Sequence, residues 1–145
     1  MTVVEQVQED ARAALKAGDR ALAGALRLIA AELQRAAKDA GGEVDEVAVL
    51  QRERKRRLES AAAYRDGGRA DLAATEEGEA ELIGTYLPAQ LDDAELAELV
   101  DAAIAETGAS SPRDMGSVMK ALTPRIAGRA DGRRVSTAVK ERLAG

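Results

Sequence analysis

Helical capping residues and glycines divide this chain into segments that all have the apolar spacing of a helix. Apolar residues recur along these segments, most clearly between residues 22 and 36, where the steps are three and four, which is the period of one helix face. Residues that favour the start of a helix precede these runs at Thr2, Asp19, Asp45, Asp92 and Ser111. No segment shows sustained alternation of apolar and polar residues, which is the pattern of a strand. The sequence therefore predicts an all-α fold.

A proline connector predicts that the helices form two groups. Pro88 disfavours helical backbone in the residue before it, and a new helix start follows at Asp92. We therefore expect an N-terminal helical domain over residues 1–87, with a bundle of about four helices. A smaller three-helix domain is expected over residues 92–145. That second segment is short for independent folding but long enough for it.

Several positions can be assigned to the inside of the predicted helices. In the second helix Leu22, Leu26, Ile29, Leu33 and Ala36 form the apolar stripe, and in the third Val47, Leu50, Leu58 and Ala61 face inward. The sixth helix contains Pro124, whose ring and missing N–H predict a kink or an early end there.

The residue inventory excludes several kinds of chemistry. The 145 residues include no Cys and no His, so thiolate and imidazole metal sites and the usual catalytic triads cannot form. No phosphate-binding loop or dinucleotide fingerprint is present. Glu76 and Glu79 share a helix face and could supply an acid and a base, but a run of charges favours a solvated face. We expect no catalytic residue, no metal and no cofactor.

The cellular compartment is predicted from three features that the sequence lacks: cysteines, a signal core and a membrane-spanning run. Absence of Cys is typical of a cytoplasmic protein. The N-terminus has no apolar signal core, and no apolar run approaches the length of a membrane span. The sequence therefore predicts a cytoplasmic protein with no membrane association.

Charge is distributed unevenly along the chain. The net charge is −5, yet residues 111–145 hold eight basic and three acidic residues, a net charge of +5. Residues 1–110 hold 13 basic and 23 acidic residues, a net charge of −10. A second basic run, residues 52–57, lies inside the predicted third helix, where its side chains fan around the circumference. That run is compatible with a solvated helix whose arginine stems cover the core edge, or with a binding surface.

The basic C-terminal segment is the best candidate for a binding surface. Its last predicted helix carries cations and hydroxyls opposite the apolar residues, which suits contact with phosphates. The turn before that helix leads into a helix N-terminus, where backbone N–H groups attract anions. Gly116 lies inside a predicted helix, which suggests close approach of another backbone, either a neighbouring helix or a partner. The candidate RNA-binding residues are Lys120, Arg129, Arg133, Arg134 and Lys140, and the candidate turn or motif residues are Gly116, Gly128, Asp131 and Gly132. Simple solvation of this face is the alternative.

Several segments resemble the GatB/YqeY family. They are Leu26-Arg27-Leu28-Ile29, Gly68-Arg69-Ala70-Asp71-Leu72, Tyr86-Leu87-Pro88, Asp114-Met115-Gly116-Ser117-Val118-Met119-Lys120 and Gly128-Arg129-Ala130-Asp131-Gly132-Arg133. The chain as a whole is similar to a stand-alone YqeY-like protein. Its C-terminal part resembles the tail domain of the B subunit of tRNA-dependent amidotransferases.

The resemblance implies a helical body with a small three-helix tail that helps to hold tRNA. Carbon–nitrogen ligase activity with glutamine as the amide donor is the label of the larger relatives, whose catalytic parts lie elsewhere. The function expected here is a non-catalytic tRNA-binding or tRNA-associated module, with a synthetase or an amidotransferase component as a further partner. The alternative is a protein–protein adaptor for an aminoacyl-tRNA synthetase or another translation factor.

Overall fold

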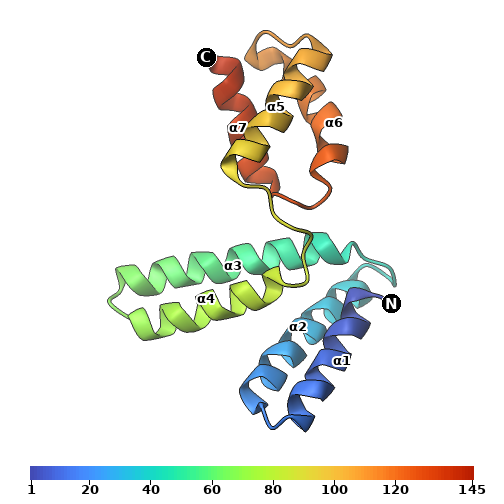
Figure 1. The fold of residues 1–145 in the computed structure, drawn as a ribbon, viewed down its shortest axis with the longest axis vertical. Coiled ribbons are helices and arrows are strands. Elements are labelled where there is room, and N and C mark those ends of the chain that lie inside the picture. Colours follow the sequence, from blue (N-terminus) through green and yellow to red (C-terminus); the bar gives the residue numbers. More distant parts are fainter. The chain divides into compact units, whose positions relative to one another are not determined.

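The structure is a computed structural model that describes residues 1–145, and its regular elements are all helices (Figure 1). This confirms the predicted all-α fold. The elements are α1 (Val3–Lys16), α2 (Arg20–Asp39), α3 (Glu46–Asp66), α4 (Ala70–Gly84), α5 (Asp93–Thr107), the short 3₁₀ helix η1 (Pro112–Asp114), α6 (Met115–Ile126) and α7 (Gly132–Ala144). None of these helices combines the length and the apolarity that a membrane crossing requires.

The predicted capping residues begin their helices as expected. Thr2 and Asp92 each form a capping box with the glutamate three residues later, at α1 and α5. The carboxylates of Asp19, Asp45 and Asp131 accept hydrogen bonds from backbone N–H groups in the first turns of α2, α3 and α7. Local sequence therefore determines where most of the helices start.

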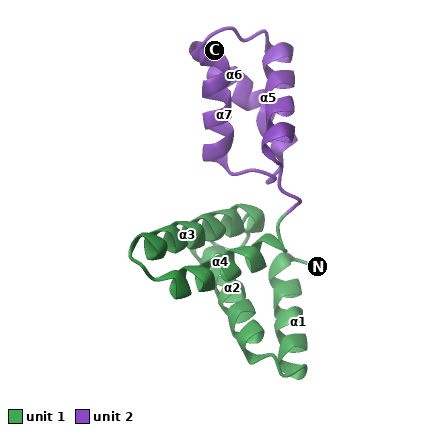
Figure 2. Cartoon of the chain, turned by 60° about the vertical axis from the view of Figure 1, so that its left-hand side comes forward, with its two compact units in different colours: residues 1–87 green, residues 88–145 purple.

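The chain consists of two compact units, Met1–Leu87 (unit 1) and Pro88–Gly145 (unit 2) (Figure 2). The helices divide between them as a group of four, α1 to α4, and a group of three, α5 to α7. Each unit has its own aliphatic core. The most deeply buried large side chains are Val7, Leu26, Leu33, Leu50 and Ile83 in unit 1 and Val100, Val118, Leu122 and Val139 in unit 2.

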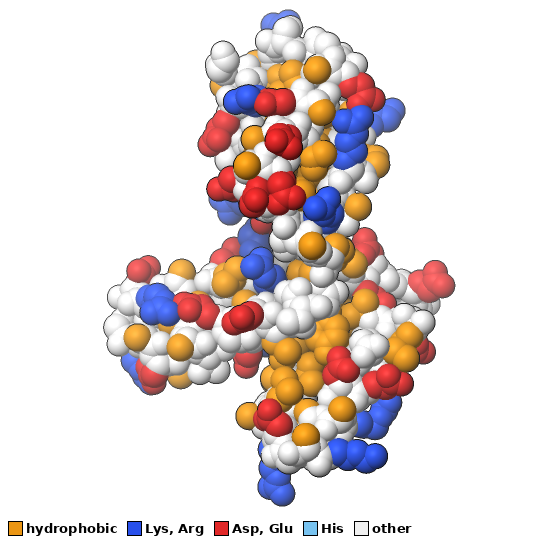
Figure 3. All heavy atoms as spheres, in the orientation of Figure 1, with side chains coloured by type: hydrophobic (Ala, Val, Ile, Leu, Met, Phe, Trp, Pro, Cys, Tyr) orange, Lys and Arg blue, Asp and Glu red, His pale blue; other side chains and the backbone are white.

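Unit 1 is built from two antiparallel helical hairpins. α1 packs along α2 and α3 packs along α4, whereas α2 touches α3 over a much shorter length. The hairpins diverge from the end where they meet (Figure 1). Apolar side chains are visible in the angle between them (Figure 3). Unit 1 therefore presents both a partly open inner angle and the outer faces of two hairpins.

Two predictions about individual residues are wrong. Leu22 and Leu58 were expected inside but are 36% and 39% exposed. The inner face of α3 instead carries the polar residues Glu53 and Arg57 between Leu50 and Ala61, which moves Leu58 to the outside. Pro124 lies in the last turn of α6, and the helix does not end there but continues to Ile126.

In unit 2, the segment before α5 is hydrogen-bonded to the turn between α6 and α7. The backbone N–H of Leu91 donates to the carbonyl of Arg129, at 2.8 Å, and the Leu91 side chain is buried in the core of unit 2. The side-chain amide of Gln90 donates to the carbonyl of Gly128, at 3.2 Å. The turn between α6 and α7 therefore lies against the start of the unit.

Candidate nucleic-acid interface

The glycine-rich turn between α6 and α7 is formed by backbone conformation and a helix cap. Ala127 and Gly128 both have left-handed backbone, with φ of 45° and 81°. An alanine in this region is strained, since its Cβ crowds the following carbonyl. Asp131 then begins α7 by accepting a hydrogen bond from the backbone N–H of Arg134, at 2.9 Å. The sequence Gly-Arg-Ala-Asp occurs twice in the chain. At residues 128–131 it lies between α6 and α7, whereas at residues 68–71 its last two residues already belong to α4.

Four of the eight cations in residues 111–145 face α5 and are neutralised by its carboxylates. Asp93 pairs with Arg134 at 2.7 Å and Asp101 pairs with Arg142 at 2.5 Å. Glu106 forms an ion pair with Arg125, and Glu95 lies 3.8 Å from Arg129. The acidic helix α5 therefore offsets half of the positive charge of the tail.

Two of the sequence-predicted RNA-binding residues also bind backbone within unit 2. The Nε of Arg129 donates to the carbonyl of Ala89 at 3.1 Å, and the Nη1 of Arg134 donates to the carbonyl of Leu91 at 2.7 Å. These guanidinium groups hold the segment before α5 against the α6–α7 turn. Their part in RNA binding stays a prediction, but both side chains have a structural role within unit 2.

The other predicted cations have no partner in the protein. Lys120, Arg133 and Lys140 are exposed and form no ion pair or side-chain hydrogen bond, and Arg113 is in the same state. Arg133 and Lys140 lie seven residues apart on α7, two turns along one face, with the exposed Thr137 between them. That face is opposite Val135, Val139 and Leu143, which fill the core.

Gly116 and Gly132 are not explained by packing inside the chain. A Cβ added at either residue would meet no heavy atom within 4 Å, and neither has positive φ. A neighbouring helix, one of the two explanations for Gly116, is thereby excluded. The surface around these glycines is open to close approach by another molecule.

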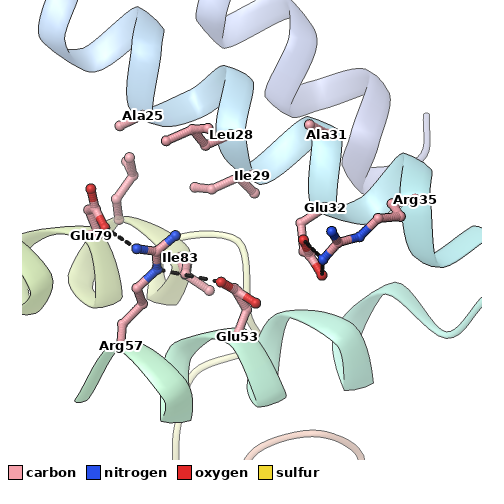
Figure 4. A pocket seen from close by; sticks show the side chains of 11 residues that line it. Ala25, Leu28, Ile29, Ala31, Glu32, Arg35, Glu53, Arg57, Glu79 and Ile83 are labelled. Atoms are coloured by element: carbon pink, nitrogen blue, oxygen red, sulfur yellow. Dashed lines mark hydrogen bonds and ion pairs between the residues drawn. The ribbon is translucent and has the colours of Figure 1, made fainter. Parts of the chain in front are cut away.

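Unit 1 holds the most enclosed charge cluster of the protein (Figure 4). Arg57 of α3 forms ion pairs with Glu79 at 2.7 Å, Glu76 at 3.3 Å and Glu53 at 3.4 Å. Glu53 is only 8% exposed. Burial lowers the pKa of Arg57, but Glu79, Glu76 and Glu53 outweigh this effect and raise its pKa above the ordinary value.

This cluster corrects the expectation that Glu76 and Glu79 lie on a solvated face. They extend from α4 to α3 and join the two helices of the hairpin. Three carboxylates around one guanidinium favour the charged form of Arg57. The geometry therefore describes an interhelical ion-pair cluster, which is a structural role.

A groove of about 280 Å³ lies beside the cluster, in the angle between the hairpins (Figure 4). Ala25, Leu28 and Ile29 of α2 form one wall, and Leu82 and Ile83 of α4 belong to the other. Leu28 is 59% exposed, which is unusual for a leucine beside a core. The groove combines an apolar floor with a charged rim.

The chain belongs to the YqeY-like protein family, because the model of that family matches residues 4–143. None of the curated proteins compared with the chain matches it. The family match covers both units, and so the two-hairpin body and the three-helix tail belong to one family pattern.

Proposed function

We propose that this YqeY-like protein is a non-catalytic module that contacts the phosphate backbone of tRNA through α6 and α7 of unit 2. The main support for this proposal is that the cations of unit 2 fall into two groups, one paired with carboxylates and one unpaired. Those facing α5 are paired with its carboxylates, whereas Lys120, Arg133 and Lys140 are exposed and unpaired. Unpaired cations on one helix face, with hydroxyls beside them, are the footprint of backbone contact.

Several features support recognition by shape and not by base sequence. The unit contains no aromatic residue on which a base could stack, since Tyr64 and Tyr86 both belong to unit 1. Gly116 and Gly132 have no side chain and no protein atom near the Cβ position, so the RNA backbone can approach α6 and α7 closely there. Resemblance of this segment to the amidotransferase B-subunit tail supports tRNA as the RNA.

The test compares two double variants that remove the same charge. Arg133→Ala with Lys140→Ala removes unpaired cations, and Arg125→Ala with Arg142→Ala removes cations that α5 already neutralises. Binding of a labelled tRNA transcript is titrated at several salt concentrations. The first variant is expected to lower the salt slope by about two, close to 0.9 for each lost phosphate contact, and the control to leave it unchanged. Equal slopes for the parent and the first variant would remove the proposal.

A second candidate, an adaptor that binds a protein helix, is favoured by the groove of unit 1. An exposed leucine beside an apolar groove is typical of helix-in-groove docking. Leu28→Glu would abolish capture of such a partner and leave tRNA binding intact. Binding to an apolar groove would depend weakly on salt, which separates the two functions in one titration series.

A further inference from the structure

We infer that the outer face of the α1–α2 hairpin is a second RNA-backbone site, centred on Arg12 and Arg27. This inference rests on the proposed function only in taking RNA as the ligand. It concerns unit 1, a different set of residues and a different helix pair. It assigns a role to cations that neither the core nor the ion pairs of unit 1 use.

A hollow of about 230 Å³ lies at the centre of this face. Its floor is formed by the buried Ala11 and Ala30, where α1 and α2 touch, and its walls by Gln8, Arg12 and Arg27. Both guanidinium groups are exposed and have no ion-pair partner. The half-buried Gln8 makes no side-chain hydrogen bond within the protein. Two guanidinium groups and an amide around a hollow provide the donors that a phosphate accepts.

One face of α2 extends this site along the hairpin. Positions separated by alternate steps of four and three share that face, and all of them are exposed. They contain three cations, one amide, one glycine and no acid: Arg20, Gly24, Arg27, Gln34 and Lys38. Ala31, at the edge of the same row, also lines the groove between the hairpins. At about 1.5 Å per residue the row is roughly 27 Å long, which suits an extended polyanion better than a single small anion.

No acid of the hairpin forms an ion pair with this row, and Glu9 and Asp39 are exposed and unpaired as well. Asp19 caps α2, Asp10 accepts from the Tyr86 hydroxyl and Glu32 binds Arg35. Glu5 closes the capping box of α1. Basic side chains project at the free end of the hairpin in Figure 3. The positive charge of this face is therefore available to a ligand although unit 1 as a whole is acidic.

The small residues make double-helical RNA the best-fitting occupant. A Cβ added to Gly24 would meet no heavy atom within 4 Å, so nothing in the protein requires a glycine there. A flat surface of Gly and Ala between cations lets a sugar–phosphate backbone approach the helix. RNA duplexes are recognised by such shape and backbone contacts across their wide minor groove.

The experiment uses the full chain and the same labelled tRNA transcript as above. Arg12→Ala with Arg27→Ala is compared with Arg65→Ala with Arg69→Ala, whose cations are paired with Glu77 and Asp71. The first variant is expected to lower the salt slope by about two and to weaken binding about tenfold or more near 0.1 M salt, with the control unchanged. A third variant, Gly24→Leu, keeps every charge and is expected to weaken binding by blocking close approach. Far-UV circular dichroism checks that helix content is retained.

The outcomes separate this inference from the proposed function. If the salt slope of tRNA binding falls for the Arg133/Lys140 variant but not for the Arg12/Arg27 variant, the hairpin site is wrong and the tail proposal stands. The reverse result supports the hairpin site and removes the tail proposal. Unchanged tRNA binding by the Arg12/Arg27 variant, together with weaker binding to phosphatidylserine vesicles, would overturn the inference in favour of a lipid surface. Full binding by Gly24→Leu would contradict the close approach.

Discussion

Replacing Arg57 by Met tests whether the charge cluster holds the α3–α4 hairpin together. Methionine keeps an aliphatic stem of similar length, so most of the packing survives and the loss reports the charge. Removing one partner of a buried ion pair costs about 3–5 kcal/mol, because the other partner stays buried without compensation. The Arg57 side chain is 28% exposed, so water screens part of this cost. We therefore expect a loss of about 2–3 kcal/mol in the free energy of unfolding of unit 1.

A neighbouring arginine provides the matched control. Arg56 lies one residue earlier on α3, has a side chain that is 66% exposed and approaches Glu53 only at 3.5 Å. Exposed pairs of this kind contribute less than about 1 kcal/mol, so Arg56→Met is expected to cost about 0.5 kcal/mol or less. The contrast between adjacent arginines isolates the effect of enclosure.

The assay can follow unit 1 alone. The chain has no Trp, and its two tyrosines, Tyr64 and Tyr86, both lie in unit 1. Tyrosine fluorescence during urea unfolding therefore reports unit 1, whereas far-UV circular dichroism reports both units. Similar losses of stability for Arg57→Met and Arg56→Met would refute the assignment of the cluster as the contact that holds the α3–α4 hairpin together.

Three further predictions concern single residues. Burial and the hydrogen bond to Asp10 raise the pKa of Tyr86, so unit 1 should lose stability above about pH 10 in an alkaline urea series, and Tyr86→Phe should remove that loss. Gly116→Ala and Gly78→Ala should each stabilise the fold by up to about 1 kcal/mol, because both glycines are in helices with open space at the Cβ position, but only Gly116→Ala should weaken tRNA binding in the titration. Asp131→Ala removes the cap of α7 and should cost about 1 kcal/mol in thermal unfolding.

The sequence was sufficient for the helices but not for the inner face of α3. Caps, glycines and apolar spacing are local signals, and they predicted most helix starts and the grouping of four and three helices. Leu58 was assigned to the core because it is apolar, and Glu53 was not, because charged residues are usually exposed. The actual inner face depends on Glu76 and Glu79 in another helix. Only the packing of α3 on α4 reveals that a glutamate can be buried there.

The candidate site shows the same limit. Sequence alone grouped Arg129 and Arg134 with Arg133 and Lys140, because all are cations near one turn. Their difference lies in partners about 40 residues away, since Arg134 reaches Asp93 and Leu91. Charge density along the chain therefore overestimates how many cations are free to bind a ligand. The signal that could have been used is the acidic character of α5, whose carboxylates needed partners in a unit otherwise rich in arginine.

The pairing of charges also explains how an acidic chain can keep exposed, unpaired cations on the two faces proposed to bind RNA. The net charge of −5 would repel RNA if all charges acted together at long range. At physiological ionic strength, however, exposed charges are screened beyond about 8 Å, so the local arrangement decides what a phosphate meets. Many of the acids lie in helix caps, in the Arg57 cluster or opposite arginines along α5. Unpaired cations remain on the outer faces of α2 and α7, and at the two proposed sites these cations, and not the net charge of the chain, would be nearest to a phosphate.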